Sequence, residues 1–454
     1  MDNILKYLEN TAEKFPDKTA VDDGNQQFTY QELLNRARHF GLSFLNRTEP
    51  GRPVAILHEK SSEILSAMFG VVYAGCFYVM IDPEQPLERL KDILTVLETD
   101  LVITDSTYRH QLDDAGYQGQ IYLLEEEPSD EAVTAQELDK LMERRSFAKN
   151  TDLLYGIFTS GSTGKPKCVA VSHQAVIDFI GHFTKQFQIT DRDRIGNQAP
   201  FDFDVSVKDI YSAIKTGATL VVIPRYMFSA PAKLMDYLCD NNITVMIWAV
   251  SALCLLSTFH VLDYRELSTV KKILFSGEVM PLKVLRDFRK HLPDVQYVNL
   301  YGPTEITCNC TYHILDSERD YSSGIPVGRP FPNEDVFLLD ENDKKIISQD
   351  TAGEICVRGT ALALGYYSSP QQNEKHFVQN PLNPYYPELI YRTGDLGKYD
   401  ENGELIFSGR KDFQIKYMGH RIELEEIERE MASIEGVERC CCIFDEKKSR
   451  LKGF

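Results

Sequence analysis

The sequence has no excess of basic side chains and no long apolar run. Its 454 residues include 49 lysines and arginines against 68 aspartates and glutamates, which gives a formal net charge of -19. General binding to nucleic acid or to an anionic membrane is not expected, because both surfaces are themselves negative. No stretch approaches the length of a membrane span, and residues 1–18 mix charged and apolar side chains, unlike a signal peptide. These absences predict a cytoplasmic protein.

The cysteines form no metal-binding pattern. Cys308 and Cys310 are separated by one residue, and Cys440 begins a run of three, and neither spacing is typical of zinc ligands. A chain of this length also needs no disulfides to stabilise its core. We therefore expect small buried thiols in a reducing compartment.

A segment rich in glycine, serine and threonine lies between two apolar stretches in LLYGIFTSGSTGKPKCVAVSH, residues 153–173. The pattern predicts a strand, a polar loop, a returning strand and a helix whose N-cap is Ser172. Glycines let backbone amides converge, hydroxyl groups add donors, and the lysines add positive charge. Such a loop is suited to holding phosphate.

This loop is not a Walker A motif. Only two residues separate Gly161 from Gly164, and Pro166 follows Lys165 where that motif has Ser or Thr at the start of a helix. By itself the loop could equally be a polar hairpin turn without a ligand. The rest of the chain has to decide between the two interpretations.

Apolar stretches alternate with helical patterns on both sides of the loop. Strands are predicted at residues 53–57, 76–81, 101–104, 219–224, 244–248, 272–275 and 296–300. Helices are predicted at residues 29–40, 61–74, 87–97, 205–214, 233–241, 251–259 and 282–291. The alternation indicates an α/β protein with doubly wound, mostly parallel sheets covered on both faces.

The remaining segments define the expected domain organisation. Residues 106–150 are acidic and loosely patterned, and no element is predicted there. From about residue 327, short strands and turns indicate a β-rich subdomain, and a charged helix at 421–435 precedes a strand at 440–444. The expected domains are a large core at 1–410, with subdomains at about 1–180, 181–325 and 326–410, and a small α+β lobe at 411–454.

Seven motifs, in order along the chain, resemble those of adenylate-forming enzymes. The resemblance is strongest to the amino-acid adenylation domains of nonribosomal peptide synthetases and to D-alanine–carrier protein ligases. The motifs are AGCFYVMIDP (74–83), TSGSTGKPK (159–167), FDVSV (203–207), NLYGPTE (299–305), GEI (353–355), YRTGDL (391–396) and GRKDFQIKYMGHRIELEEIE (409–428).

The resemblance implies a reaction and its participants. A carboxylate and ATP would give an acyl-adenylate and pyrophosphate, and the acyl group would then pass to the phosphopantetheine thiol of a carrier protein. Little covalent chemistry falls to the protein, which has to position the reactants and neutralise charge. ATP and Mg²⁺ are the implied cofactors, an amino acid is the implied substrate, and neither nucleic acid nor membrane is an expected partner.

The resemblance also assigns the nucleotide site. Thr304, Glu305 and Lys165 form the expected catalytic set, with Glu305 as the Mg²⁺ ligand because a hard cation prefers oxygen. Asp395 would accept hydrogen bonds from the ribose hydroxyls, and Arg410 would be a second ribose or phosphate contact. Asp412 would be the hinge of the C-terminal lobe. The expected ATP- and AMP-binding residues are Thr159, Ser160, Gly161, Ser162, Thr163, Gly164, Lys165, Gly277, Glu278, Asn299, Tyr301, Gly302, Thr304, Asp395 and Arg410.

The amino-acid site depends on Asp204, which matches the family residue that binds a substrate α-amino group. Because Asp204 and Lys208 are four residues apart in a predicted helix, they could instead satisfy each other. If Lys208 is free for substrate, a glutamate-like side chain is expected; if it pairs with Asp204, a small residue such as alanine is expected. The expected substrate-binding residues are Asp204, Val205, Lys208, Ser251, Leu274, Ser276, Leu300, Cys308 and Asn309.

One departure from the family pattern concerns the C-terminal lobe. Family members carry a further lysine segment that contacts the substrate carboxylate and the α-phosphate, whereas this sequence stops at Phe454. A truncated lobe is the expectation. Two alternatives stay open: an acyl-CoA or aryl-acid ligase, against which Asp204 argues, and a catalytically impaired ATP-binding module, which the missing lysine would favour.

Overall fold

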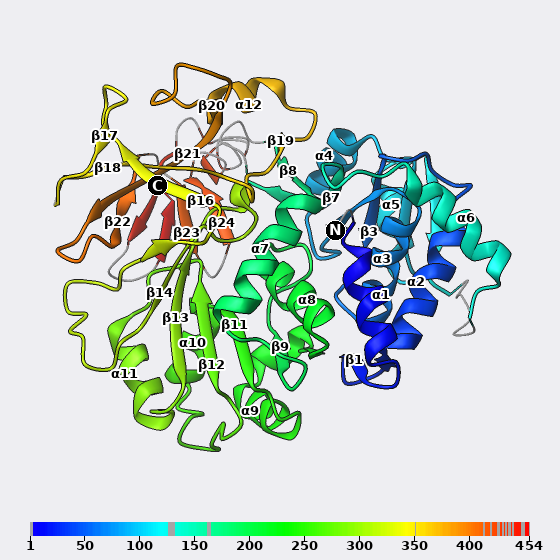
Figure 1. Cartoon of the computed structure of the whole chain (residues 1–454), viewed down its shortest axis with the longest axis horizontal. Helices are drawn as coiled ribbons and strands as arrows, with labels where there is room; N and C mark the ends of the chain where they lie inside the picture. Colours follow the sequence, from blue (N-terminus) through cyan, green and yellow to red (C-terminus); the bar gives the residue numbers. More distant parts are fainter. Residues whose placement is uncertain are drawn as a thin grey trace.

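A computed structural model describes residues 3–125, 132–160, 165–349, 351–411, 414–417, 420–424, 427–428, 431, 434, 437, 440–445 and 450–453. Within these residues the chain forms three large sheets and two small hairpins (Figure 1). No helix of the described part is long and apolar enough to cross a membrane. The predicted α/β class is confirmed.

The N-terminal sheet has the order β19-β8-β7-β4-β3-β5-β6. Its strands are β3 (Pro53–Leu57), β4 (Phe77–Ile81), β5 (Leu101–Thr104), β6 (Gln120–Leu123), β7 (Leu153–Thr159), β8 (Lys167–Ser172) and β19 (Gly365–Tyr366). The five strands from β7 to β6 pair in parallel. By contrast, β8 runs antiparallel to both of its neighbours, as expected for a strand that returns from a hairpin loop.

Helices cover both faces of this sheet, because successive strand residues point to opposite sides. On one face Val54, Ile56 and Met80 pack with α2 and α3, and on the other Ala55 and Val79 pack with α4 and α5. The helices are α1 (Leu5–Lys14), α2 (Tyr30–Phe44), α3 (Ser62–Tyr73), α4 (Leu87–Leu97), α5 (Arg109–Asp114) and α6 (Ala135–Ser146). Thr29 and Glu32 form a capping box at the start of α2.

The segment at residues 106–150 is more regular than the sequence predicted. It contains α5, β6 and α6, although no element was expected there. α5 has only six residues and buries only Leu112, and α6 buries only Leu141. Elements with so few buried side chains leave almost no hydrophobic periodicity, which is the signal that sequence reasoning uses.

The central sheet has the order β15-β14-β13-β12-β11-β9-β10-β1-β2. Its strands are β1 (Thr19–Asp22), β2 (Gln27–Thr29), β9 (Arg194–Asn197), β10 (Thr219–Val222), β11 (Val245–Ala249), β12 (Lys272–Ser276), β13 (Gln296–Tyr301), β14 (Thr311–Ile314) and β15 (Arg329–Pro330). β1 pairs in parallel with β10, so residues near the N-terminus complete a sheet that is otherwise built from the middle of the chain.

Two groups of helices enclose the central sheet. α7 and α8 lie between it and the N-terminal sheet, and one continuous apolar core joins the two sheets there. α9, α10 and α11 cover the opposite face around Trp248 and Phe275. The bounds are α7 (His173–Gln186), α8 (Val205–Thr216), η1 (Arg225–Ser229), α9 (Pro231–Asp240), α10 (Val250–Thr258), α11 (Leu282–His291) and η2 (Thr304–Ile306).

The third sheet is antiparallel, as the predicted β-rich subdomain requires. It has the order β17-β16-β18-β21-β20, and β22 also pairs with β21. Its strands are β16 (Glu334–Leu339), β17 (Lys345–Ile346), β18 (Gly353–Gly359), β20 (Phe377–Gln379), β21 (Leu389–Tyr399) and β22 (Leu405–Arg410), and the helix α12 (Pro370–His376) directly precedes β20. In Figure 1 this sheet lies above the central sheet.

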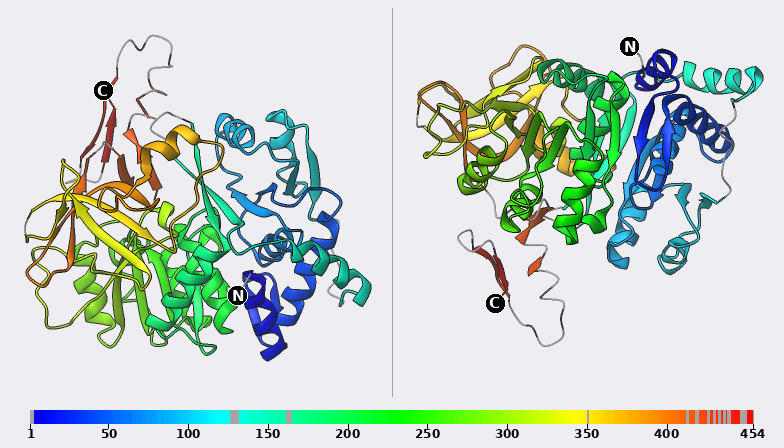
Figure 2. Two further views of the ribbon diagram at one scale, coloured as in Figure 1. Left: turned by 45° about the horizontal axis from the view of Figure 1, so that its top comes forward. Right: turned by 90° about the horizontal axis from the view of Figure 1, so that it is seen from below.

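The C-terminal residues differ from the prediction. Two hairpins are present, β23 (Gln414–Tyr417) with β24 (His420–Glu423), and β25 (Cys442–Asp445) with β26 (Arg450–Gly453). In the right-hand view of Figure 2 the second hairpin lies apart from the body. Residues 421–423 therefore belong to a strand, and the helix predicted from residue 421 was wrong at its start. Ile422 and Leu424 alternate with charged residues, which is the period of a strand rather than of a helix. The predicted hinge Asp412 lies outside the described residues.

His173, the first residue of α7, is buried and makes a contact that requires a neutral ring. Its Nδ1 accepts the backbone N–H of Ile4 at 3.4 Å. Burial, assisted by the charge of Arg145, lowers the pKa of His173 from 6.5 to about 4. An unfolded histidine binds a proton near pH 6.5, so protonation of His173 favours the unfolded chain as the pH falls.

We expect the wild-type protein to lose roughly 3 kcal/mol of unfolding free energy between pH 6.5 and 4 through this one group. The His173→Gln variant keeps an acceptor but does not titrate, so it should lack this part of the pH dependence. Urea unfolding of both proteins at several pH values between these limits measures the difference. If the unfolding free energy falls equally with pH in the two proteins, the contribution assigned to His173 is contradicted.

Candidate functional site

The predicted site residues gather at the carboxyl edge of the central sheet. β9, β11, β12 and β13 run in parallel, so their carboxyl ends meet at the same edge. Asn197, Ser276 and Tyr301 are the last residues of three of these strands, and Ser251 lies two residues beyond the end of β11. Ligands of open α/β sheets bind at such an edge.

Lys208 lies within this edge, completely buried on α8. Its Nζ donates to Asn309 Oδ1 at 2.6 Å and is 3.5 Å from Ser276 Oγ. In the described part of the chain the Lys208 ammonium therefore contacts two of the predicted pocket residues rather than Asp204. Burying an ammonium group is costly unless oxygen acceptors receive its protons, and Asn309 and Ser276 supply them.

Asp204 lies directly before α8 and is partly exposed. Its side chain makes no capping hydrogen bond to the helix, and its backbone oxygen accepts the thiol of Cys308 at 3.0 Å. Asp204 and Cys308 therefore lie side by side, although they are far apart in the sequence. Of the other predicted pocket residues, Leu274 and Leu300 are buried in the core, and Val205 and Ser251 are partly exposed.

The short segment after β13 has an unusual backbone. Thr307 and Cys308 both have positive φ, 51° and 78°, which non-glycine residues seldom adopt. A Cβ at Gly302 would lie 2.4 Å from the Asn309 Cα, so the segment folds back tightly over this glycine. The tight fold turns Asn309 toward Lys208, and Thr307 Oγ1 anchors it by donating to the Ala361 backbone oxygen at 2.7 Å.

Tyr301, Asp395 and Arg410 form an interlocked group. The Tyr301 hydroxyl donates to Asp395 Oδ2 at 2.6 Å, and Arg410 forms an ion pair with Asp395 Oδ1. Pairing of β21 with β22 sets Asp395 opposite Arg410. Burial, together with the Asp395 charge, raises the pKa of Tyr301 well above its usual value, so the phenol remains a hydrogen-bond donor. Nearby, the Asn299 side chain donates to the Pro326 backbone oxygen at 2.8 Å.

Glu305 is held by a residue that sequence reasoning did not select. Glu305 is completely buried in η2, and the Tyr366 hydroxyl donates to its Oε1 at 2.7 Å. The Lys167 Nζ lies 5.4 Å from the centre of the Tyr366 ring, within the range of a cation–π contact. Tyr366 reaches this place because β19 pairs with β8. No motif spacing connects Tyr366 with Glu305, so only the strand pairing reveals the contact.

The surroundings of Glu305 fit a cation that is shared with a bound nucleotide. Mg²⁺ takes oxygen ligands and is usually held by one or two carboxylates together with substrate phosphates. Glu305 provides one buried carboxylate. Among the described residues, no group of three or more His, Cys, Asp and Glu side chains could hold a metal by itself. An ion at Glu305 would therefore need phosphate oxygens as further ligands.

The predicted phosphate loop lies between β7 and β8, which pair as a hairpin. β7 ends at Thr159, which pairs with Lys167 of β8, and residues 161–164 lie outside the described residues. Thr159 Oγ1 is buried and has no hydrogen-bond partner within the described part of the chain, while Lys165 is exposed. At the end of β12, Gly277 has a φ of 96° and Glu278 is partly exposed.

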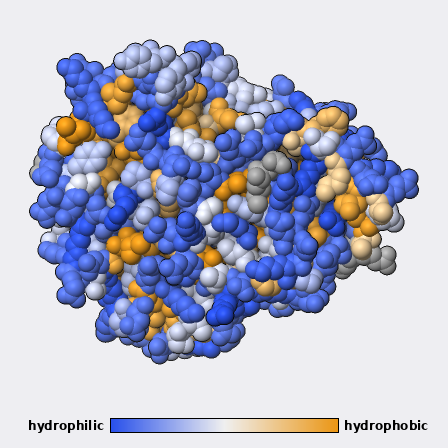
Figure 3. Space-filling view, viewed as in Figure 1, coloured by the Kyte–Doolittle hydropathy of each residue, from blue (hydrophilic) through white to orange (hydrophobic). Residues whose placement is uncertain are grey.

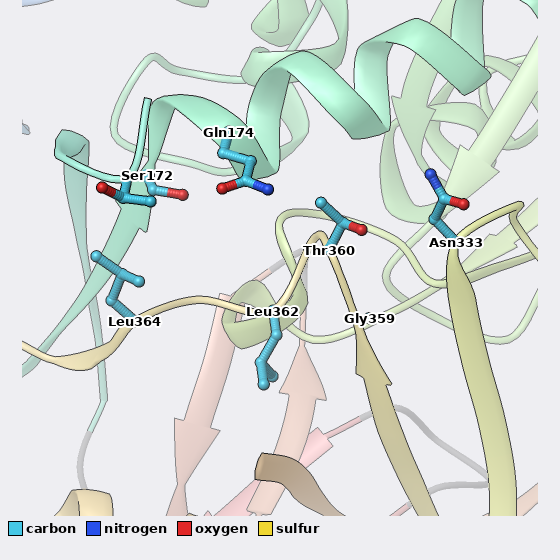
Figure 4. A pocket seen from close by; sticks show the side chains of 8 residues that line it. Ser172, Gln174, Asn333, Gly359, Thr360, Leu362 and Leu364 are labelled. Atoms are coloured by element: carbon cyan, nitrogen blue, oxygen red, sulfur yellow. The ribbon is translucent and has the colours of Figure 1, made fainter. Parts of the chain in front are cut away.

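A separate hollow lies beside the start of α7. It has a volume of ≈ 460 Å³ and is lined by Ser172, Gln174 and Asn333 together with residues between Gly359 and Leu364 (Figure 4). None of its lining residues belongs to the predicted nucleotide or amino-acid site. The face drawn in Figure 3 is mostly hydrophilic, with small separate apolar patches. The candidate site is thus defined by its converging side chains and not by the size of a cavity.

Comparison with known proteins agrees with this arrangement. The AMP-binding enzyme family matches residues 8–367. Tyrocidine synthase 1 of Brevibacillus parabrevis is 33% identical over 427 residues, which cover 94% of this chain and 38% of the synthase. Zwittermicin A synthase ZmaJ of Bacillus cereus is 32% identical over 449 residues, which cover 97% of this chain and 82% of that protein. The chain thus spans well under half of tyrocidine synthase 1.

A solved structure gives the same result. The alpha-methyl-L-serine-AMP-bound form of the nonribosomal peptide synthetase FmoA3 matches with a TM-score of 0.81 and 27% identity, covering 92% of this chain and 45% of that chain. The chain therefore belongs to the AMP-binding enzyme family, as an amino-acid adenylating ligase of the nonribosomal peptide synthetase type.

Proposed function

We propose that the chain activates a glutamate-like amino acid with ATP, releases pyrophosphate, and loads the aminoacyl group onto the phosphopantetheine thiol of a carrier protein. The main support for this proposal is the course of one short segment. The stretch from Tyr301 to Asn309 begins at the interlocked group with Asp395 and ends at the buried ammonium of Lys208. A single short segment thus joins the residues assigned to the nucleotide with those assigned to the amino acid.

The activation step transfers an adenylyl group. A carboxylate oxygen of the amino acid forms a bond to the α-phosphorus of ATP, and the bond from that phosphorus to the pyrophosphate oxygen breaks. Asp395 is assigned to the ribose hydroxyls, which would replace its present contacts with Tyr301 and Arg410. Thr304 is assigned to the α-phosphate, and Lys165 with the loop before it to the departing pyrophosphate. A Mg²⁺ ion held by Glu305 and the phosphates would supply further neutralisation of charge.

The substrate assignment follows from the polarity of the pocket. Asp204 is partly exposed and lies at the start of the helix that carries Lys208, so its carboxylate is suited to the α-amino group of a substrate. Lys208 is buried and faces Asn309 and Ser276, so a carboxylate or amide side chain would find both a cation and hydrogen-bonding groups. An apolar substrate side chain would lie beside a charge without neutralising it.

The test is ATP–pyrophosphate exchange with all common amino acids and several aryl and fatty acids. We expect exchange with glutamate or a close analogue, because its side chain pairs with Lys208. In Lys208→Ala we expect kcat/KM for that amino acid to fall by at least about tenfold, the loss of one charge-assisted hydrogen bond. Lys215→Ala, on the same helix but bonded to α7, is the control and should keep the wild-type preference.

Three outcomes would contradict parts of the proposal. An unchanged preferred amino acid in Lys208→Ala would remove the substrate assignment. Exchange with aryl or fatty acids alone would indicate the related acid ligases. No exchange with any acid, while ATP still binds, would indicate an impaired nucleotide-binding module.

The contact between Tyr366 and Glu305 gives a second prediction. In Tyr366→Phe the Glu305 carboxylate loses a hydroxyl donor at 2.7 Å, so its orientation is less fixed. We expect the exchange rate at saturating ATP to fall roughly tenfold, as is typical when a group that orients a ligand is lost. The control is Tyr297→Phe, which also removes a buried hydroxyl hydrogen bond, to the Leu292 backbone oxygen, but lies outside the site. Equal rates in the two variants would contradict this role of Tyr366.

A further inference from the structure

Lys60 extends from the loop between β3 and α3 into the central sheet. Its Nζ donates to the backbone oxygens of Asn197 at 3.0 Å, Gln198 at 2.8 Å and Ala199 at 3.3 Å. It also donates to the side-chain oxygen Oδ1 of Asn197 at 2.9 Å. One cation from the N-terminal sheet thus gathers three consecutive carbonyl groups at the carboxyl end of β9.

Asn197 connects Lys60 with α8. Asn197 is completely buried, and its side-chain nitrogen donates to Asp209 Oδ2 at 2.8 Å. Asp209 is also completely buried and directly follows Lys208 on α8. Its other oxygen, Oδ1, has no hydrogen-bond partner in the described part of the chain. The negative charge of Asp209 is instead offset by the nearby positive charges of Lys60 and Lys208.

The segment held by Lys60 leads directly to the proposed amino-acid pocket. Residues 200–203 join Ala199 to Asp204, the residue assigned to the substrate α-amino group. Within the same segment, the Gln198 side chain accepts a hydrogen bond from the backbone N–H of Ala249, the last residue of β11, at 3.3 Å. Lys60 therefore holds two parts of the proposed pocket. It binds the backbone that precedes Asp204, and through Asn197 and Asp209 it is connected to the helix that carries Lys208.

We propose that Lys60 is a positioning residue for the amino-acid substrate, which fixes Asp204 and Lys208 without touching the substrate itself. The inference deepens the proposed function and rests on it. Its physical basis is that a charged hydrogen bond to a backbone carbonyl is stronger than a neutral one, and that here one ammonium makes several of them. The nucleotide residues Tyr301, Asp395 and Glu305 are held by other contacts, so they do not depend on Lys60.

The positive charge of Lys60 and the negative charge of Asp209 stabilise each other. Burial lowers the pKa of Lys60 to about 7, and the charge of Asp209 opposes this shift. Burial likewise raises the pKa of Asp209 to about 7, and the side chains of Asn197, Lys208 and Lys60 oppose it. Removal of the Lys60 charge would raise the pKa of Asp209 further and favour the neutral carboxylic acid beside Lys208.

The experiment measures KM for the amino acid and for ATP separately, by pyrophosphate exchange, in wild type, Lys60→Met and Lys60→Gln. We expect KM for the amino acid to rise about tenfold in Lys60→Met and less in Lys60→Gln, which keeps a donor, while KM for ATP changes by less than about twofold. The matched control is Lys215→Met, which also removes an ammonium bonded to backbone oxygens, those of Ile180 and Gly181, but away from the pocket. Both KM values should stay at wild-type levels in this control.

The outcomes separate this inference from the proposed function. Absence of exchange in the wild type would overturn the proposed function itself. Exchange in the wild type, with both KM values raised equally or both unchanged in the Lys60 variants, would overturn the positioning role. If Lys60→Met does not fold, Lys60→Gln decides by the same comparison.

Discussion

The candidate site depends on buried ammonium groups that must find oxygen partners. Lys60 enters from the N-terminal sheet and Lys208 from α8, and both end near the carboxyl edge of the central sheet. An unpartnered charge at either place would cost several kcal/mol, roughly the size of a domain's whole stability margin. The chain therefore brings Asn197, Asn309 and Ser276 to them from three different elements. These contacts fix β9, α8 and the segment after β13 relative to one another.

The two halves of the site are joined through a strained segment. Tyr301 contacts Asp395 of the third sheet, and eight residues later Asn309 contacts Lys208. Between them, Gly302 permits a close backbone approach, and Thr307 and Cys308 adopt positive φ. Such strain persists only where surrounding contacts hold it, and it is common at functional sites. Ribose binding at Asp395 and side-chain binding at Lys208 would therefore act on the two ends of one rigid connection.

Much of the fold followed from the sequence, because long buried strands and amphipathic helices leave a clear period. The N-cap at Ser172 and the hairpin around residues 159–167 were predicted and are confirmed. The pairing of β1 with β10 was not predicted, because no local pattern reports a partner so distant in sequence. The neighbours of Lys208 followed from the pocket motif, which placed Ser276 and Asn309 beside it. The spacing left a pair with Asp204 open, and only the hydrogen bonds of the folded chain decide between the two. The helix predicted from residue 421 starts too early, because the charged residues hid an alternating strand pattern at residues 421–423.

We propose that one edge of the central sheet binds adenylate and an anionic side chain together. Calorimetric binding of two stable sulfamoyl-adenosine analogues, one carrying glutamate and one carrying leucine, tests it most directly. The adenosine part is the same in both ligands, so any difference in affinity reports the pocket around Lys208. We expect the glutamyl analogue to bind at least about tenfold more tightly, which is the effect of one charge-assisted contact. Equal affinities, or tighter binding of the leucyl analogue, would contradict it.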